Sequence, residues 1–156
     1  YCDSLFDLSP LQHIRHQIVE IDRSCIDGKY RNGSTILFMW KLIFQYMQQH
    51  GFEYLMGCSS LSIQDGGHRA VALNQHLHER QHVSSEFAIK AKTPIDLLIP
   101  PFKGVLRIPP ILKGYLNVGA KVCSEPAFDQ LFNTADFLTI LKMADMKPNY
   151  VKRFSR

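Results

Sequence analysis

Residues 18–40 read IVEIDRSCIDGKYRNGSTILFMW and join a branched apolar segment, through a glycine-containing turn, to the start of a long apolar one. The branched residues predict a strand over residues 17–26. Apolar side chains at helical spacing, followed by a glycine, predict a helix over residues 34–50. Because residues 54–61 form another short apolar run, we expect a second strand there, parallel to the first. The order strand, helix, strand predicts one βαβ unit.

The rest of the chain predicts further helices and strands around this unit. The expected elements are a helix over 68–80, a helix that opens at Pro109 or Pro110 and ends near Gly119, and strands around 121–125 and 136–143. The segment 90–110 holds five prolines among apolar residues, so it cannot form a regular helix. We also expect the helix over 34–50 to be buried on more than one face, because both its sides are apolar. Together these elements indicate an α/β fold.

Composition indicates one globular domain. The chain has 156 residues, of which 46% are apolar, and a formal net charge of +4. This mild charge favours an anionic ligand or partner over nucleic acid. The four cysteines lie far apart, which favours reduced thiols in the cytosol over a disulfide framework or a zinc site. No apolar run is long enough to span a membrane and no signal peptide is visible, so we expect a cytoplasmic protein.

The turn KYRNGST, residues 29–35, is a candidate phosphate site. It lies between a strand and a helix N-terminus, where free N–H groups and the helix dipole attract anions, and Gly33 allows close approach. Arg31 can add a charge-assisted hydrogen bond. The alternative is an ordinary helix start, with Asn32 or Ser34 as the capping residue and Arg31 in solvent. The spacing matches neither the Walker A nor the GxGxxG pattern, which argues against nucleotide hydrolysis and dinucleotide redox chemistry.

Charged residues inside the first strand are the second candidate site. In a regular strand Glu20 and Asp22 share one face and Arg23 lies on the other, so a contact between Glu20 and Arg23 requires a β-bulge near Asp22. Glu20 can then remove a proton from an amine while Arg23 orders the site. The alternative is a salt-bridged surface on an edge strand.

Other candidate residues give weaker signals. His78 and His82 are spaced for a metal, but no third ligand is evident, so we predict no metal site. Cys58 and Ser59 lie at a strand end without an obvious base, which favours packing over a nucleophilic role.

Two long blocks carry a family resemblance. EIDRSCIDGKYRNGSTILFMWKLIFQYMQQHGFEYLMGCSSL (residues 20–61) and PPILKGYLNVGAKVCSEPAFDQLFNTADFLTILKMADM (residues 109–146) resemble the bacterial GNAT-superfamily N-acyltransferases that make ornithine lipids, often described as haemolysin-like, and the related N-acyl amino acid synthases. The E-x-x-R of Glu20–Arg23 is also similar to the signature of acyl-homoserine lactone synthases.

The resemblance implies a GNAT-like α/β fold with a mixed, splayed sheet, and transfer of an acyl group to an amine such as the α-amine of ornithine. Glu20 and Arg23 would lie at the reaction centre, and N–H groups of the first strand would stabilise the oxyanion. The phosphopantetheine phosphate would be held by Arg31, Asn32, Gly33, Ser34 and Thr35. Ser34 and Thr35 stand where the superfamily often has small glycines, so we expect acyl carrier protein to be a better donor than acyl-CoA. No covalently bound cofactor is expected.

The resemblance also implies strands before residue 1, so we interpret the chain as a single GNAT-like domain, residues 1–156, that is the C-terminal portion of a longer protein. The apolar residues of 95–112 would contact a long, 3-hydroxylated acyl chain, or touch the inner face of a membrane. Lys103, Arg107 and Lys113 would attract the carrier protein or anionic lipid. Two alternatives stay open, namely a signal synthase that makes an N-acyl amino acid or acyl-homoserine lactone, and a non-catalytic acyl-thioester-binding module.

Overall fold

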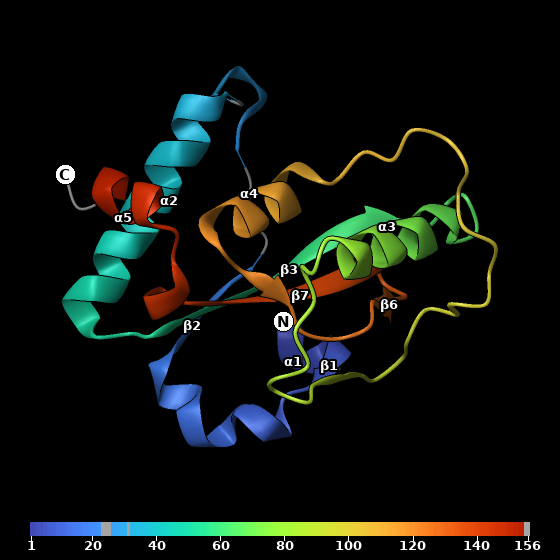
Figure 1. Cartoon of the computed structure of the whole chain (residues 1–156), viewed down its shortest axis with the longest axis horizontal. Coiled ribbons are helices and arrows are strands. Elements are labelled where there is room, and N and C mark those ends of the chain that lie inside the picture. Colours follow the sequence, from blue (N-terminus) through green and yellow to red (C-terminus); the bar gives the residue numbers. More distant parts are fainter. Residues whose placement is uncertain (23–25, 31, 155–156) are drawn as a thin grey trace.

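The computed structural model describes residues 1–22, 26–30 and 32–154 (Figure 1). The strands are β1 (Phe6–Asp7), β2 (Ile18–Ile21), β3 (Tyr54–Ser62), β4 (Lys90–Ala91), β5 (Lys121–Val122), β6 (Ala127–Asp129) and β7 (Thr134–Lys142). The α-helices are α1 (Cys2–Leu5), α2 (Gly33–His50), α3 (His68–Glu79), α4 (Pro110–Val118) and α5 (Pro148–Phe154). Short 3₁₀ helices span η1 (Ser9–Gln17), η2 (Gly28–Tyr30) and η3 (Met143–Asp145).

The main sheet is mixed, with β3 and β7 at its centre. β2 pairs with β3 in parallel, and α2 connects them, so the predicted βαβ unit is confirmed. β7 runs antiparallel to β3 along all nine residues of each strand. Beyond β7, β5 and β6 pair with different parts of that strand, while β1 and β4 form a separate two-stranded ribbon.

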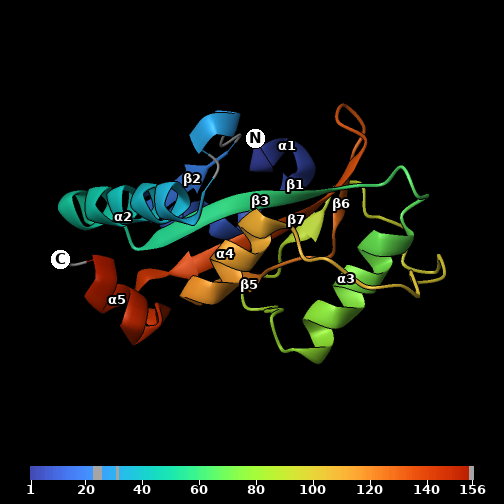
Figure 2. The same ribbon diagram turned by 90° about the horizontal axis from the view of Figure 1, so that it is seen from above.

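The two faces of the sheet bury different segments (Figure 2). Met56 of β3 faces the N-terminal segment, in a cluster that includes Cys2, Phe6 and Leu11. Leu55 points to the opposite face, where helices α2, α4 and α5 contribute Phe44, Tyr115 and Phe154, among others. A third cluster lies under α3 and α4. The strand alternation therefore decides which residues of β3 can meet α4.

Local signals at both ends explain where α2 begins and ends. The Asn32 side chain accepts a hydrogen bond from the Thr35 N–H, and Gly51 closes the helix in the left-handed region at φ 70°. The predicted burial on more than one face is wrong, because only Phe44 and Met47 of this helix are buried. Phe38 is 60% exposed, and other apolar side chains on the helix are also exposed: Ile36, Leu42 and Tyr46. The helix packs through one stripe, as helices at a sheet edge commonly do.

Other differences from the sequence predictions include strands that are shorter than expected. β2 ends at Ile21, and β5 covers only Lys121–Val122. The strand predicted around 136–143 begins earlier, at Thr134, directly after Asn133 at φ 53°, and its first residues pair with β6. α5 was not predicted. The irregular segment 90–110 is confirmed apart from the short β4, and the helices predicted over 68–80 and from Pro110 are confirmed.

Cys2, Cys58 and Cys123 are free thiols. Within the described ranges, no helix combines the length and apolar character needed to cross a bilayer.

Candidate active site

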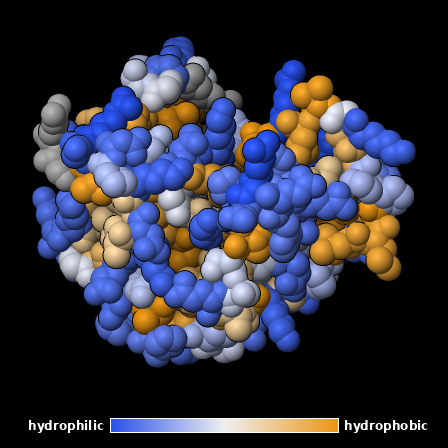
Figure 3. Space-filling view, viewed as in Figure 1, coloured by the Kyte–Doolittle hydropathy of each residue, from blue (hydrophilic) through white to orange (hydrophobic). Residues whose placement is uncertain are grey.

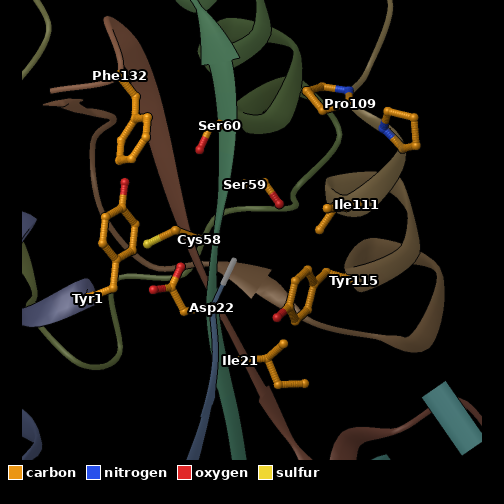
Figure 4. Close-up of a pocket in the computed structure, with 11 residues that line it drawn as sticks. Tyr1, Ile21, Asp22, Cys58, Ser59, Ser60, Pro109, Ile111, Tyr115 and Phe132 are labelled. Atoms are coloured by element: carbon orange, nitrogen blue, oxygen red, sulfur yellow. The ribbon is translucent and has the colours of Figure 1, made fainter. Parts of the chain in front are cut away.

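A cavity opens where β2 and β3 cease to pair. Their parallel register runs from Ile18–Tyr54 to Ile21–Gly57, and β3 then continues to Ser62. A cavity of about 470 Å³ lies beside this part of β3 (Figure 4). It is lined by Tyr1, Ile21, Asp22, Cys58, Ser59, Ser60, Pro109, Pro110, Ile111, Tyr115 and Phe132.

The cavity reaches both faces of β3 because successive side chains alternate. Ser59 lies on the side of α4, with Ile111 and Tyr115, whereas Cys58 is directed toward Tyr1 (Figure 4). The open edge of the strand thus lies between an α4 wall and an N-terminal wall. This is the shape needed to hold an extended ligand against one strand.

Tyr115 brings a hydroxyl to the point where the two strands diverge. Its ring lies over Gly57, where an added Cβ would overlap the Tyr115 hydroxyl and would lie 2.7 Å from the Ile21 carbonyl oxygen. Trp40 supports the ring edge-on, with 5.0 Å between ring centroids. Burial raises the pKa of Tyr115, so its hydroxyl stays protonated at neutral pH. The site therefore contains a buried proton donor.

A smaller apolar cavity, of about 110 Å³, adjoins the first between α4 and α2. The two share Ile21, Pro110, Ile111 and Tyr115 in their walls, and the second adds residues of α2, among them Met39, Trp40 and Ile43. A ligand in the main cavity can therefore extend along apolar surface toward the N-terminal half of α2.

The sequence-predicted phosphate turn lies at the N-terminus of α2. Asn32 Oδ1 accepts from the Thr35 N–H at 2.9 Å and from the Thr35 hydroxyl at 3.1 Å, so the expected cap is present. Gly33 and Ser34 are exposed, and a Cβ at Gly33 would meet no described atom within 4 Å outside its chain neighbours and its own helix. Arg31 lies outside the described residues. The Thr35 N–H and hydroxyl are already used in the helix cap, whereas Gly33 and Ser34 remain accessible to an anion.

Glu20 lies close to the N-terminal segment of the chain. Its Oε1 accepts from the Cys2 N–H at 2.8 Å and is 2.9 Å from the Tyr1 backbone nitrogen. Burial raises the pKa of Glu20, and the hydrogen bond from the Cys2 N–H lowers it. Glu20 lines a separate small cavity, whereas Asp22 lines the main one. Arg23, and the bulge predicted near Asp22, lie outside the described residues.

Cys58 packs against Cys2, with 3.2 Å between the two Sγ atoms. The hydrogen bond with Cys2, followed by burial, raises the pKa of the Cys58 thiol. A thiol that stays protonated is a poor nucleophile, which supports the packing interpretation of this residue.

Sequence reasoning missed three features of this site, namely Tyr115, Asp22 as a cavity residue, and Tyr1. The Tyr1 hydroxyl donates to Asp129 and is 2.8 Å from the Asp136 carboxylate, and both acidic residues are buried. Pro109 and Pro110 did indicate in the sequence where the helix that carries Tyr115 begins. No sequence pattern indicates that this side chain turns toward β3.

The comparisons with known proteins agree with this architecture. A family model described as an acetyltransferase (GNAT) domain matches residues 1–41. L-ornithine N(alpha)-acyltransferase of Rhizobium meliloti (strain 1021) is 30% identical over 164 residues, covering 99% of this chain and 55% of the relative. The proteins of the same name from Agrobacterium fabrum and Rhodobacter capsulatus are 28% and 24% identical, over 56% and 62% of their lengths and 99% and 100% of this chain.

The chain thus spans little more than half the length of these curated relatives. No solved structure matches it significantly. The mixed sheet and the cavity at its divergence fit a GNAT-like fold, and the similar proteins align with nearly the whole chain. The chain is thus similar to the GNAT-superfamily N-acyltransferases of the ornithine-lipid group, as the resemblance of its sequence indicates.

Proposed function

We propose that this chain carries the reaction centre of an N-acyltransferase that moves an acyl group from acyl carrier protein to the α-amine of an amino acid such as ornithine. The observation that supports this most is the 470 Å³ cavity at the divergence of β2 and β3, with the protonated Tyr115 hydroxyl in its wall. The names of the relatives support ornithine as the acceptor.

The reaction forms a C–N bond and breaks a C–S bond. The neutral amine attacks the thioester carbonyl, a tetrahedral oxyanion forms, and the amine proton passes to a base. When the intermediate collapses, the leaving sulfur takes the Tyr115 proton, which the base returns through solvent. Because burial keeps Tyr115 neutral, the proton is available where the sulfur departs.

Glu20 is the base we propose, acting through a water. Its Oε1 accepts from the Cys2 N–H, and Glu20 lies two residues before Asp22 of the cavity wall. A carboxylate is a weak base for an ammonium ion, so the acceptor must arrive as the neutral amine. Asp22 is the competing carboxylate because it lines the cavity itself.

Two variants distinguish which of the two carboxylates is the base. Glu20→Gln is expected to lower kcat by about 100-fold, the range of general-base catalysis, and Asp22→Asn by no more than about threefold. Product formation from acyl carrier protein thioester and ornithine is measured by mass spectrometry, and circular dichroism checks the fold. The reverse order of effects would make Asp22 the base.

The turn before α2 is proposed to bind the phosphopantetheine phosphate through residues 31–35. Gly33→Ala should leave stability unchanged or slightly higher, because the position has open space and alanine favours helix. A phosphate that approaches closely would meet the added methyl, so the KM for the acyl donor should rise about tenfold at unchanged kcat. Steady-state kinetics with a melting curve for each protein measure both effects. An unchanged KM contradicts phosphate binding here, and Gly28→Ala is the control because its Cβ position is also open.

Acyl carrier protein is proposed as the donor, with Arg107 and Lys113 as its contacts. Both are exposed and flank Pro109–Ile111 at the cavity wall. No acidic residue occurs between residues 97 and 124, so this segment itself offers only positive charge to an acidic partner.

Peripheral membrane contact is proposed for the segment between β4 and α4. Leu98 is 92% and Val105 88% exposed, and Figure 3 shows hydrophobic side chains at the side of the molecule where Figure 1 draws this segment. The Phe102 N–H donates to the His68 carbonyl at 3.0 Å, and His68 Nδ1 lies 2.6 Å from the Pro100 carbonyl oxygen. The part of the segment between the exposed side chains of Leu98 and Val105 is therefore held to α3. Exposed apolar side chains beside basic residues fit an anionic bilayer surface.

Sedimentation with phosphatidylglycerol vesicles tests this contact. Replacing Leu98 and Val105 by Glu should abolish binding, because it removes the inserted side chains and adds charge that the lipid repels. Leu131→Glu is the matched control, because Leu131 is an exposed leucine at the turn between β6 and β7. Equal binding of all three proteins contradicts the proposal.

The overall function is tested by incubating the protein with a 3-hydroxyacyl carrier protein thioester and ornithine, and by detecting N-acylornithine by mass spectrometry. Product with another amino acid or with S-adenosylmethionine instead would support a signal synthase. Tight binding of the thioester without product from any amine would support a binding module.

A further inference from the structure

We infer that the Ser59 hydroxyl donates a hydrogen bond to the thioester carbonyl oxygen of the acyl donor as that oxygen becomes the oxyanion. This role rests on the proposed acyl transfer and adds a side-chain donor to the strand N–H groups expected there.

The Ser59 hydroxyl is buried and finds no partner in the described part of the chain. Ser59 is only 2% exposed, and its Oγ makes no hydrogen bond to residues 1–22, 26–30 or 32–154. Among the described residues, Asn74 is the other buried side chain with such an atom. An unsatisfied buried hydroxyl lowers the stability of the free protein, because the group has lost its hydrogen bonds to water. A group held at that cost in a cavity wall points to a partner that the ligand supplies.

The position of Ser59 on β3 indicates which part of the ligand it meets. It lies two residues beyond Gly57 on the same face of the strand, about 6.6 Å along it. The Tyr115 hydroxyl lies over Gly57, and Figure 4 shows Ser59 and Tyr115 on the same side of β3. Two hydroxyls thus flank one short stretch of open strand edge. A thioester placed between them presents its sulfur to Tyr115 and its carbonyl oxygen to Ser59.

The surroundings of Ser59 favour a lone acceptor oxygen over a charged group. The wall on this side of β3 is apolar apart from the two hydroxyls, with Ile21, Pro109 and Ile111 nearby. A free carboxylate or ammonium group would lose its hydration there without a counter-charge. A thioester carbonyl is neutral when it binds and gains negative charge only in the reaction. A hydroxyl in an apolar wall stabilises the carbonyl oxygen most when this negative charge develops.

The test is Ser59→Ala, assayed for melting temperature and for kcat and KM with an acyl carrier protein thioester and ornithine. Because the mutation removes an unsatisfied group, the free protein should melt at the same or a higher temperature. kcat should fall about 10- to 100-fold, since strand N–H groups still hold the oxyanion, while KM changes less than about twofold. Ser59→Thr keeps the hydroxyl and should retain most of kcat. Ser62→Ala, on the same strand but beyond the cavity, is the matched control and should match wild type.

Three outcomes overturn the inference. A raised KM at unchanged kcat would mean that Ser59 binds another part of the donor, such as a pantetheine amide. A lower melting temperature with proportionate loss of activity would mean a structural role. Wild-type kinetics for Ser59→Ala would mean no role. If the wild-type protein itself forms no product with any amine, the proposed function fails, and that result is distinct from all three.

Discussion

Replacing Tyr115 with Phe should lower kcat by about 100-fold or more, within the range measured for loss of a general acid, while the protein stays folded and binds the acyl donor. The ring keeps its edge-on contact with Trp40, and only the hydroxyl over Gly57 is lost. The leaving thiolate would then have to take a proton from water. Turnover with acyl carrier protein thioester and ornithine, with a melting curve for each protein, measures the effect.

Two further observations make this result specific. Tyr46→Phe is the control, because Tyr46 lies exposed on α2 away from the cavity. Burial raises the pKa of Tyr115, so the wild-type rate should show no fall from its ionisation up to about pH 10, near the usual pKa of a tyrosine. Normal turnover of a folded Tyr115→Phe protein would rule out this role for the hydroxyl. A loss of rate that begins well below this pH and is absent from that variant would instead contradict the raised pKa of Tyr115.

Gly57→Ala should disrupt both the sheet and the site. The added methyl would overlap the Tyr115 hydroxyl and lie 2.7 Å from the Ile21 carbonyl oxygen, so either α4 or β2 must move. Overpacking of this kind costs about 1–3 kcal/mol of stability. A displacement of the proton donor by about 1 Å can reduce turnover by about 100-fold. Urea unfolding and the acyl-transfer assay measure the two losses.

A double variant separates the two clashes. Tyr115→Phe in the Gly57→Ala background removes the overlapping hydroxyl but leaves the contact with Ile21, so part of the lost stability should return. A Gly57→Ala protein with wild-type stability and turnover would show that the ring does not rest on the strand as described. Non-additive unfolding free energies are expected, because the two residues touch.

The βαβ unit was predictable because its signals are local. Asn32 caps α2, Gly51 ends it, and the branched or apolar runs on either side fix two parallel strands. The paired prolines before α4 and the glycine after it marked that helix in the same way. A helix end or a turn is decided by a few neighbouring residues, and the sequence displays those residues directly.

The site was only partly predictable because its geometry is tertiary. Tyr115 and Gly57 are far apart in sequence and meet only because α4 packs on β3. Ser59 was interpreted as packing because no base is evident near it in the sequence, and local sequence does not reveal a buried hydroxyl that lacks a partner among the described residues. The apolar composition of α2 predicted burial on two faces, but the number of segments that cover a helix is set by the whole fold.

The long pairing of β3 with β7 bears on how the chain is made. Tyr54 pairs with Lys142 and Ser62 with Thr134, so the centre of the sheet closes only after most of the chain has left the ribosome. Until then the nascent chain carries a nine-residue strand with an unpaired edge, and α4 with its tyrosine is also still to come. Contacts this distant in sequence slow folding and expose strand edges to other chains. The strand that serves as the floor of the cavity is therefore also the segment that most needs protection during synthesis.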